Sequence, residues 1–468
     1  MNEQKSEIRY TGSNPLGFAP IGKLLVKFAV PSVTSMLVNS IYNIVDQIFI
    51  GQGIGYLGNA ATTISLPIVT IILAFSTLIG AGGSAYASIK LGERDKAQAE
   101  KVLGNSLTLS LIIGIIIMTL GLSFLEPLVR IFGASDNTVA YAMQYARFIL
   151  YAAPFNVLGI VLSNFARNDG SPVTAMVSLV AGAVLNTILD PIFIFVFNWG
   201  VMGAALATAI SQVLTAIILI HYFLRKSNMR FTSKSIKLNF GICKNFIILG
   251  ISSCVLNMAT TFLNIILNNL LVTYGDLSAV GGDIALSAMG VVLKINMIII
   301  SICIGIGVGS QPILGFNRGA NQPERVRKTY LTAVSMGFAV TMVGFILCQT
   351  IPHIVLRLFE SNSQEFIDFA VRCMRIYLGA VFVAGIQIVT TNYFQATGQP
   401  LKANIMSLLR QVILLIPLLL ILPKFMGLDG ILYAGLFADL SAGIISTVFA
   451  VTEIRKLNRW IDELKKTA

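Results

Sequence analysis

Acidic and amide side chains recur at helical spacing inside two otherwise apolar stretches of this sequence. In the first stretch Asn39, Asn43 and Asp46 are four and three residues apart, a spacing that places them on one face of a helix. In the second stretch Asn186 and Asp190 are four residues apart, within the run LNTILDP. Carboxylate and amide oxygens suit a hard cation such as sodium, and a carboxylate also accepts a proton. The pattern predicts a site for a proton or small cation, with Asn39 and Asn43 supporting the face that carries Asp46.

The composition indicates that much of this chain faces lipid. Of its 468 residues, 55% are hydrophobic and only 12% are charged, about half the charged fraction of a typical soluble domain. The five cysteines include no Cys-x-x-Cys pair, so we expect small apolar fillers and neither a disulfide nor a zinc site. The sequence contains no nucleotide-binding loop, His-Glu-x-x-His helix or nucleophile elbow, and we therefore expect that the protein is not an enzyme.

Long apolar stretches account for most of the chain. A helix needs about 20 mostly apolar residues to cross the hydrocarbon region of a bilayer, and the sequence contains twelve such stretches. We therefore predict an all-α, polytopic membrane protein with twelve transmembrane helices. Several stretches exceed the minimum, which implies tilt, a kink or extension beyond the membrane. The predicted spans are residues 22–50, 62–89, 103–126, 141–166, 173–197, 201–224, 242–272, 283–312, 329–352, 369–395, 402–423 and 430–453.

Lysine and arginine are concentrated in alternate loops. The amino-terminal segment, the even-numbered loops and the carboxy-terminal tail are basic, whereas the odd-numbered loops together hold only Arg130, Arg357 and Lys424. Because basic residues accumulate on the cytoplasmic side, we expect a multi-pass protein of the cell (inner or plasma) membrane with both termini in the cytoplasm. The net charge of +12 then reflects membrane topology, and nucleic acid is not an expected partner.

This orientation brings the polar residues of the two stretches to one depth. Asp46 and Asp190 lie toward the outer ends of their helices, and Thr208 lies about two turns into the sixth span. An ionisable group inside a span is costly unless it is paired or hydrated. We therefore expect a site for a proton or Na⁺ at Asp46, Asn186 and Asp190, with Thr208 as a further ligand. The alternative is that the two acids cap or bridge helices and never titrate.

The chain repeats itself after about 227 residues. The segment ARNDGSPVTA at 166–175 matches FQATGQPLKA at 394–403. Each half then holds six spans in the same orientation, and such repeats are typical of transporters that alternate access between two lobes. We predict two pseudo-symmetric six-helix bundles: an amino-terminal lobe (1–224), a cytoplasmic linker (225–241) and a carboxy-terminal lobe (242–468).

The repeat does not preserve the acids. Leu267 occupies the position that aligns with Asp46, and Leu418 occupies the position that aligns with Asp190. The predicted cation cluster therefore exists only once, in the amino-terminal lobe.

Other polar residues mark the second half. Asn257 and Asn264 belong to a polar stripe in the seventh span, and Lys294, Arg410 and Asp439 are charged residues inside later spans. We consider Asn257, Asn264, Lys294 and Asp439 possible contacts for a substrate in a cavity. A structural ion pair between Lys294 and Asp439 is an equally good interpretation.

Pro31 interrupts the first span without a helix boundary nearby. A proline inside a helix removes one backbone hydrogen bond and favours a kink. A bendable helix that carries an acid near its outer end could convert ion binding into movement, so Pro31 is a candidate hinge. A static kink is the alternative.

The chain resembles a known family, the multidrug and toxic compound extrusion (MATE) transporters, over essentially its whole length. The resemblance is carried by PSVTSMLVNSIYNIVDQIFIG in span one, ARNDGSP before span five, LNTILDPIFIF within it, GVMGAALATAISQ in span six and QATGQP before span eleven. It implies a V-shaped pair of six-helix bundles that exports organic, often cationic or amphipathic, compounds against sodium or proton entry. By position, it places the family's amino-lobe cation site on Asp46, Asn186 and Asp190, with Thr208 included.

Span seven has no acid, and Asp368 lies only at the edge of span ten. This departure favours the DinF- or MepA-like branch over the NorM-like branch. The resemblance implies small organic molecules and the lipid bilayer as partners, no cofactor beyond the coupling ion, and function as a monomer. A flippase for lipid-linked precursors is the alternative function, and a membrane enzyme or receptor is disfavoured because no catalytic motif or extramembrane domain is apparent.

Overall fold

The computed structural model describes residues 15–229, 237–357 and 364–467, and within these ranges the chain is helical and contains no strand. Eleven of the described helices are long and apolar enough to cross a membrane. Phe366–Tyr377 and Val381–Ala396 supply a twelfth span if the bent pair is counted as one. The prediction of an all-α polytopic membrane protein is therefore confirmed.

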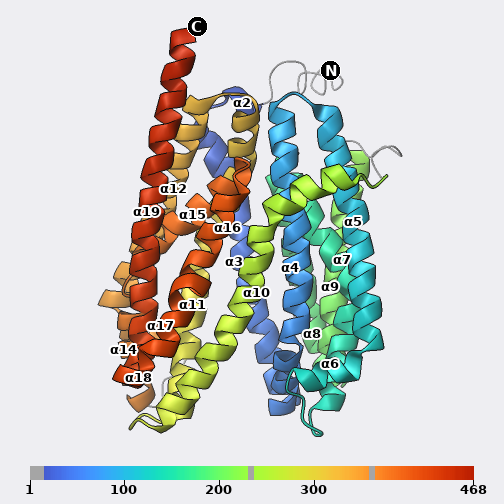
Figure 1. Ribbon diagram of the computed structural model, residues 1–468. Helices are drawn as coiled ribbons and strands as arrows, with labels where there is room; N and C mark the ends of the chain where they lie inside the picture. The colour runs from blue at the N-terminus through green and yellow to red at the C-terminus, as the bar shows by residue number, and fades with distance from the viewer. Residues whose placement is uncertain (1–14, 230–236, 358–363, 468) are drawn as a thin grey trace.

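The helices follow the same order in the two halves of the chain (Figure 1). The first half contains α2 (Pro15–Phe18), α3 (Ile21–Ile54), α4 (Tyr56–Gly92), α5 (Lys96–Ser123), α6 (Leu125–Ile131), α7 (Val139–Asn168), α8 (Pro172–Pro191), the π-helix η1 (Ile192–Val196) and α9 (Gly200–Arg225). The second half contains α10 (Phe240–Asp276), α11 (Gly282–Gly319), α12 (Pro323–Thr350), α13 (Pro352–Arg357), α14 (Gln364–Tyr377), the 3-10 helix η2 (Val381–Val383), α15 (Ala384–Ala396), α16 (Pro400–Leu408), the π-helix η3 (Leu409–Leu415), α17 (Ile416–Ile421), α18 (Pro423–Met426) and α19 (Leu428–Thr467).

Corresponding turns in the two halves have the same backbone chemistry. Gly170 and Gly398 both adopt positive φ, at 87° and 76°, and each is followed two residues later by the proline that starts α8 or α16. Glycine adopts positive φ without strain. Proline suits the first turn of a helix because the N–H groups of that turn have no acceptor within the helix, so the missing N–H of proline costs no hydrogen bond. The predicted repeat is thus visible in local geometry as well as in sequence.

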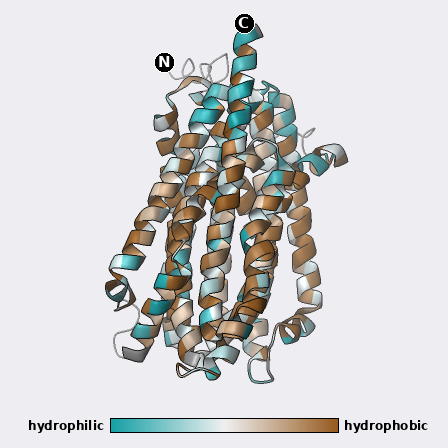
Figure 2. Cartoon of the chain, turned by 60° about the vertical axis from the view of Figure 1, so that its left-hand side comes forward, coloured by the Kyte–Doolittle hydropathy of each residue, from teal (hydrophilic) through white to brown (hydrophobic). Residues whose placement is uncertain are grey.

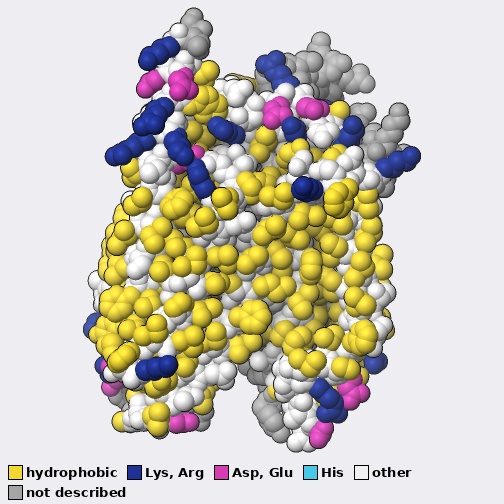
Figure 3. All heavy atoms as spheres, in the orientation of Figure 1, with side chains coloured by type: hydrophobic (Ala, Val, Ile, Leu, Met, Phe, Trp, Pro, Cys, Tyr) yellow, Lys and Arg dark blue, Asp and Glu magenta, His cyan; other side chains and the backbone are white. Residues whose placement is uncertain are grey.

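The two ends of the bundle differ in charge. Helix ends at Ile21, Gly92, Arg225 and Gly319 lie at the end where α2 and the last turns of α19 are found, at the top of Figure 1, and Lys and Arg gather there in Figure 3. We call this the basic end, and the other the opposite end. Figure 2 shows hydrophobic residues over the middle of the helices and hydrophilic ones toward the ends, most clearly in α19.

The helices α3 and α10 each begin in the core of one lobe and finish in the other, and we call them the crossing helices. Near the basic end Phe28 of α3 packs in a buried cluster with Ile313 of α11 and Val389 of α15. Likewise Phe246 of α10 belongs to the buried cluster of the first half, together with Phe165. Farther along, α3 packs on α8 and α10 packs on α16.

Glycines bring helix backbones of the two lobes together near the basic end. A Cβ atom added to Gly92 would lie 2.0 Å from the carbonyl oxygen of Phe316, and one added to Gly319 would lie 2.0 Å from that of Ile89. An added Cβ on Gly250 would lie 1.8 Å from the Leu78 carbonyl oxygen. We call Gly92, Gly250 and Gly319 the glycine seam. In Figure 3 the two lobes meet over the upper part of the molecule and are separated by a notch at the opposite end.

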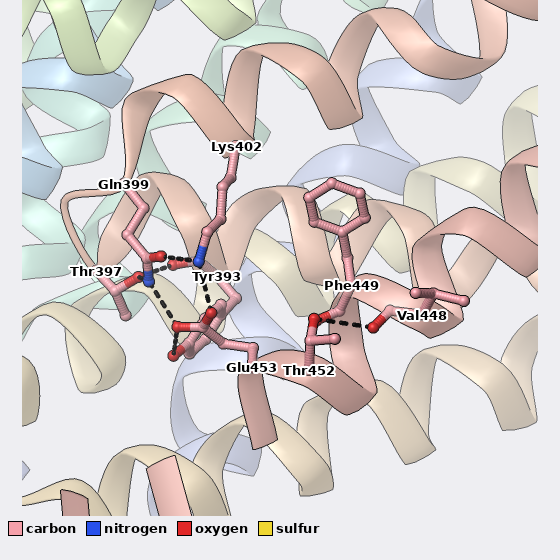
Figure 4. Close-up of polar contacts among 8 residues, drawn as sticks. All are labelled: Tyr393, Thr397, Gln399, Lys402, Val448, Phe449, Thr452 and Glu453. Carbon is pink, nitrogen blue, oxygen red and sulfur yellow. Dashed lines mark hydrogen bonds and ion pairs between the residues drawn. The ribbon is translucent and has the colours of Figure 1, made fainter. Parts of the chain in front are cut away.

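Buried acids anchor the basic end of each lobe. In the second half Glu453 of α19 accepts hydrogen bonds from Lys402 (2.7 Å) and Gln399 (2.8 Å), as Figure 4 shows. In the first half Asp169 accepts from the Tyr222 hydroxyl (2.5 Å) and from the backbone N–H of Met229 (3.1 Å), where the linker begins. These contacts fix the turn before α8 or α16 to the last helix of its own lobe.

The predicted tenth span, 369–395, is not one straight helix. It is broken after Tyr377, and the two parts are inclined by 45°. Gly379 lies in the break, where an added Cβ would meet the carbonyl oxygen of Arg375 at 2.9 Å, so the turn is tight. In the first half the corresponding α7 stays continuous although it contains Pro154. Residues 230–236 of the predicted linker lie outside the described residues.

Candidate cation site and inter-lobe cleft

Three of the predicted cation ligands meet between α8 and α9. The side-chain amide of Asn186 donates to Asp190 Oδ1 at 3.2 Å and to Thr208 Oγ1 at 3.3 Å. Asn186 and Asp190 are four residues apart on α8, so they lie on one helix face, and that face is directed at α9. The Asp190 side chain is completely buried.

The fourth ligand, Asp46, comes from the crossing helix α3. Its carboxyl group lies close enough to that of Asp190 for the two groups to interact, and Asp46 is only 8% exposed. Close packing holds α3 against the π-helix η1 beyond this point, since a Cβ on Gly53 would lie 2.2 Å from Ile194. The rings of Phe49 and Phe195 meet edge to face, with centroids 6.4 Å apart. The structure therefore brings all four predicted ligands together.

Several oxygens of this cluster have no hydrogen-bond partner among the described residues. They are Asp46 Oδ1, Asn186 Oδ1 and Asp190 Oδ2, all buried. Buried polar atoms in proteins are normally hydrogen-bonded, and unpaired carboxylate oxygens at this depth are costly. A proton shared by the two carboxyl groups, or a sodium ion among the oxygens, would satisfy them. The donor set fits either cation.

Two tyrosines near the acids were not predicted. The side chains of Tyr42 and Tyr145 lie close enough to both Asp46 and Asp190 for electrostatic interaction. Tyr42 precedes Asp46 by four residues and shares its helix face, so its spacing was a usable signal. Tyr145 comes from α7, and nothing in its local sequence indicates that it approaches the acids.

Asn39 and Asn43 do not support the cation cluster in the structure. Both side chains are exposed, and the Asn43 amide donates to the backbone oxygen of Asn39 at 2.6 Å. Asp46 is buried against α8 instead. Three residues advance a helix by about 300°, so the side chains of Asn43 and Asp46 point about 60° apart around the helix axis. Asp46 therefore packs against a neighbouring helix, whereas Asn43 is exposed.

The charged residues of the second half pair differently from one alternative in the prediction. Asp439 of α19 forms its ion pair with Arg410 of η3, and no Lys294–Asp439 pair exists between these described residues. Asp439 is 2% exposed, and Tyr377 lies beside the pair. Lys294 is instead exposed on α11. Helix rotation decides the outcome, because Arg410 faces α19 and Lys294 does not.

The two asparagines predicted to line a cavity, Asn257 and Asn264, also have different surroundings: one is hydrogen-bonded and the other is exposed. Asn257 of α10 donates to Thr77 of α4 at 3.1 Å and so links a crossing helix to the first lobe. Asn264, two turns farther along α10, is exposed. Asn257 is therefore part of the contact between lobes, whereas Asn264 is free to face a cavity.

Pro31 is buried inside the continuous helix α3. It has no N–H, so the carbonyl of Lys27 lacks its ordinary helical donor. The next turn carries hydroxyls that bond back to the backbone, Thr34 to Val30 (2.9 Å) and Ser35 to Pro31 (2.8 Å). Such bonds weaken the regular helical pattern and accompany bends. The first span thus has a locally softened segment near the basic end.

These features define a duplicated bundle of membrane-spanning helices with a buried carboxylate pair in one half only. A comparison with known families agrees: the chain matches the MatE family at residues 31–192 and again at residues 252–421. The chain therefore belongs to the MatE family, whose members are membrane transporters and not enzymes, and the predicted family is confirmed. The double match also reproduces the predicted repeat.

Known proteins resemble the chain over most of its length. It is 30% identical to the multidrug export protein MepA of Staphylococcus aureus (strain MSSA476) over 426 residues, which are 90% of this chain and 91% of the relative. A crystal structure of a MATE protein in a straight conformation matches with a TM-score of 0.89 at 25% identity, covering 96% of this chain and 99% of the other. The bent conformation of a MATE protein matches with a TM-score of 0.85 at 25% identity, covering 94% and 96%.

Proposed function

We propose that this protein is a secondary antiporter that exports small organic, often cationic or amphipathic, compounds in exchange for protons or sodium ions. The observation that carries the proposal is the buried pair Asp46–Asp190, in which one oxygen of each carboxyl group has no hydrogen-bond partner among the described residues. An exchangeable cation is the simplest way to satisfy two carboxylates in an apolar surrounding. The similarity to a multidrug export protein supports the choice of cargo.

We propose further that the basic end faces the cytoplasm, so that both termini lie inside and the notch between the lobes opens outward. The concentration of Lys and Arg at this end supports the orientation. The protein then works as a monomer, with the lipid bilayer and its organic cargo as partners. Ser278→Cys, between α10 and α11, should react with a membrane-impermeant thiol reagent from outside, and Lys226→Cys only from inside.

The mechanism follows from repulsion between the two acids. When both carboxylates are ionised they repel, which favours an α3 that keeps the lobe open to a cationic compound. A proton, or a sodium ion between the carboxylates, removes the repulsion and lets α3 bend near Pro31. Ion and cargo then compete through two conformations without sharing atoms. MATE crystal structures described as straight and as bent support two such states for this fold.

The direct test removes each charge without changing the shape of the side chain. Asp46→Asn and Asp190→Asn should each reduce ion-driven efflux of a fluorescent cationic dye by about tenfold or more, because the cation site loses a carboxylate. Efflux is measured in inverted vesicles with sodium and pH gradients imposed separately, which also identifies the ion. Asp136→Asn, an acid whose side chain is 92% exposed, is the matched control and should transport normally.

Expression level and unfolding temperature in detergent distinguish a coupling role from a structural one. If the two acids only bridged helices, both variants would unfold at lower temperature while the remaining folded protein kept its ion dependence. Full ion-driven transport by both variants would contradict the proposed cation site.

A further inference from the structure

We infer that Lys294 binds an anionic group, a carboxylate, of the exported compound, and that the preferred cargo is amphoteric, with one basic and one acidic group. The inference rests on the proposed export function and names the chemical class of its cargo. Four observations carry it: the helix face that bears Lys294, the departure of α3 from that face, the depth of Lys294 relative to Asp46, and its lack of a partner.

Lys294 lies on the face of α11 that is turned toward α3. Ser301, seven residues farther along α11, shares this face because seven residues make about two turns. The Ser301 hydroxyl is hydrogen-bonded to that of Ser40 on α3 at 2.8 Å. One turn beyond, a Cβ on Gly305 would lie 2.5 Å from Val33, so the two helices are in tight contact there.

Toward the opposite end, α3 leaves α11 and joins the first lobe. Beyond Ser40 it carries Asp46 and Gly53 to α8 and η1. The α11 face is therefore uncovered at the level of Lys294, which is exposed. A Cβ added to Gly290, one turn farther out, would meet no heavy atom within 4 Å. Lys294 accordingly faces the space between the lobes that ends in the notch of Figure 3, and we call this space the cleft.

Asp46 and Lys294 lie at the same depth on the two walls of this cleft. Asp46 is six residues from Ser40 and Lys294 is seven residues from Ser301, and the two helices run in opposite directions. At a rise of about 1.5 Å per residue, both lie about 10 Å from the same Ser40–Ser301 hydrogen bond. One wall therefore carries an acid buried within it, and the facing wall carries an exposed base.

The charge of Lys294 is uncompensated within the described residues. The structure gives it neither a hydrogen bond nor an ion pair, and Asp439 is already paired with Arg410. The other basic residues of α3, α4, α10 and α11 are near the basic end: Lys23, Lys27, Lys90, Lys244 and Arg318. An ammonium group in a cleft with low-dielectric walls attracts an anion more strongly than one in open water. A carboxylate on the cargo supplies that anion, while a basic group on the same molecule faces the acidic lobe.

The test uses two dyes that differ in one group. Rhodamine 110 carries a free carboxylate, and rhodamine 123 is its methyl ester. Lys294→Gln should weaken binding of the free acid about tenfold, as expected for loss of a charged hydrogen bond, and should change binding of the ester less than twofold. Lys294→Arg should retain most of the preference for the acid. Lys424→Gln, which removes an exposed lysine of α18 far along the chain from α11, is the control for net charge and should leave both dyes unaffected.

Labelling tests the placement of Lys294 without any dye. Lys294→Cys should react with a membrane-impermeant thiol reagent from the side of the opposite end, and wild-type protein, in which four of the five cysteines are buried, gives the background. Absence of labelling would overturn the inference, because the side chain would then face lipid. Equal losses for both dyes in Lys294→Gln, or no loss for either, would also overturn it.

The inference and the proposed function fail in different ways. Wild-type protein that exports the ester but neither binds nor exports the free acid would overturn the role of Lys294 and leave ion-driven export intact. Failure to export either dye under any ion gradient would contradict the proposed function itself.

Discussion

Each lobe buries acidic side chains within its helices, and the two lobes use them in opposite ways. In the first lobe, Asp46 and Asp190 keep oxygens without partners, so the pair can accept a cation. In the second lobe, Asp439 forms an ion pair with Arg410, so its charge is neutralised within the protein. Under the proposed function, one duplicated backbone thus supports a carboxylate pair that exchanges a cation and an ion pair that does not.

The repeat shows that the residues of the ion pair have no charged counterparts in the first lobe. Arg410 corresponds to Gly182 of α8, 228 residues earlier, and Asp439 corresponds to Gln212 of α9, 227 residues earlier. A Cβ on Gly182 would lie 2.4 Å from Thr215 Oγ1, so α8 and α9 have no room for an arginine. In the second lobe the π-helix η3 carries Arg410. The tight packing of α8 against α9 therefore excludes a basic side chain at the position that corresponds to Arg410.

The largest expected effect concerns the ion pair of the second lobe. Asp439→Asn or Arg410→Met leaves one buried charge without its partner, and we expect each to lower the free energy of unfolding by about 3–5 kcal/mol. The double variant Arg410→Met/Asp439→Leu replaces both charges with apolar groups and should be nearly as stable as wild type. Thermal unfolding in detergent measures the first effect, and sodium- and pH-dependent dye efflux should remain in the double variant.

A double variant that is stable but whose dye efflux no longer depends on sodium or pH would contradict this comparison of the lobes. The second lobe would then take part in coupling, and the assignment of exchange chemistry to the first lobe alone would be wrong.

An intermediate effect is expected at the glycine seam, where the two lobes are equivalent. Gly92→Ala and Gly319→Ala each introduce a Cβ only 2.0 Å from a carbonyl oxygen of the other lobe. Overpacking of this kind costs about 1–3 kcal/mol, and we expect both variants to unfold at similarly lowered temperatures. Gly290→Ala is the matched control on α11, because an added Cβ there meets nothing within 4 Å. A loss at only one of the two seam positions would show that the seam is not symmetric.

The smallest effect should come from making one crossing helix resemble the other. The family match begins at Pro31 in α3 and at Ser252 in α10, and α10 has no proline along its 37 residues. Pro31→Ser should reduce the free energy that couples ion and dye binding by about 1 kcal/mol and leave dye affinity in the absence of the ion nearly unchanged. Isothermal titration of a dye at several pH and sodium values measures the coupling. Unaltered coupling would assign the movement to another helix.

Much of this arrangement could be predicted from the sequence because its signals are local. The apolar stretches give the spans, and the spacing of Asn186 and Asp190 fixes their common face. Spacing alone could not show that Asn43 is exposed while Asp46 packs against α8. Which helix covers each side chain depends on segments far away in the sequence. The choice of Arg410 over Lys294 as partner of Asp439 has the same origin, because it depends on how η3 and α11 are rotated about their axes.

The seam at Gly92 and Gly319 also bears on how readily the proposed transporter would change between inward-open and outward-open states. Gly92 and Gly319 carry no side chains, so closing the interface at these two positions orders none. Separation of α4 from α11 there exposes no apolar side chain of either residue, and each Å² of apolar area would cost about 25 cal/mol. The inward-open and outward-open populations can then remain within the few kcal/mol that the binding of one ion or one small molecule is able to shift.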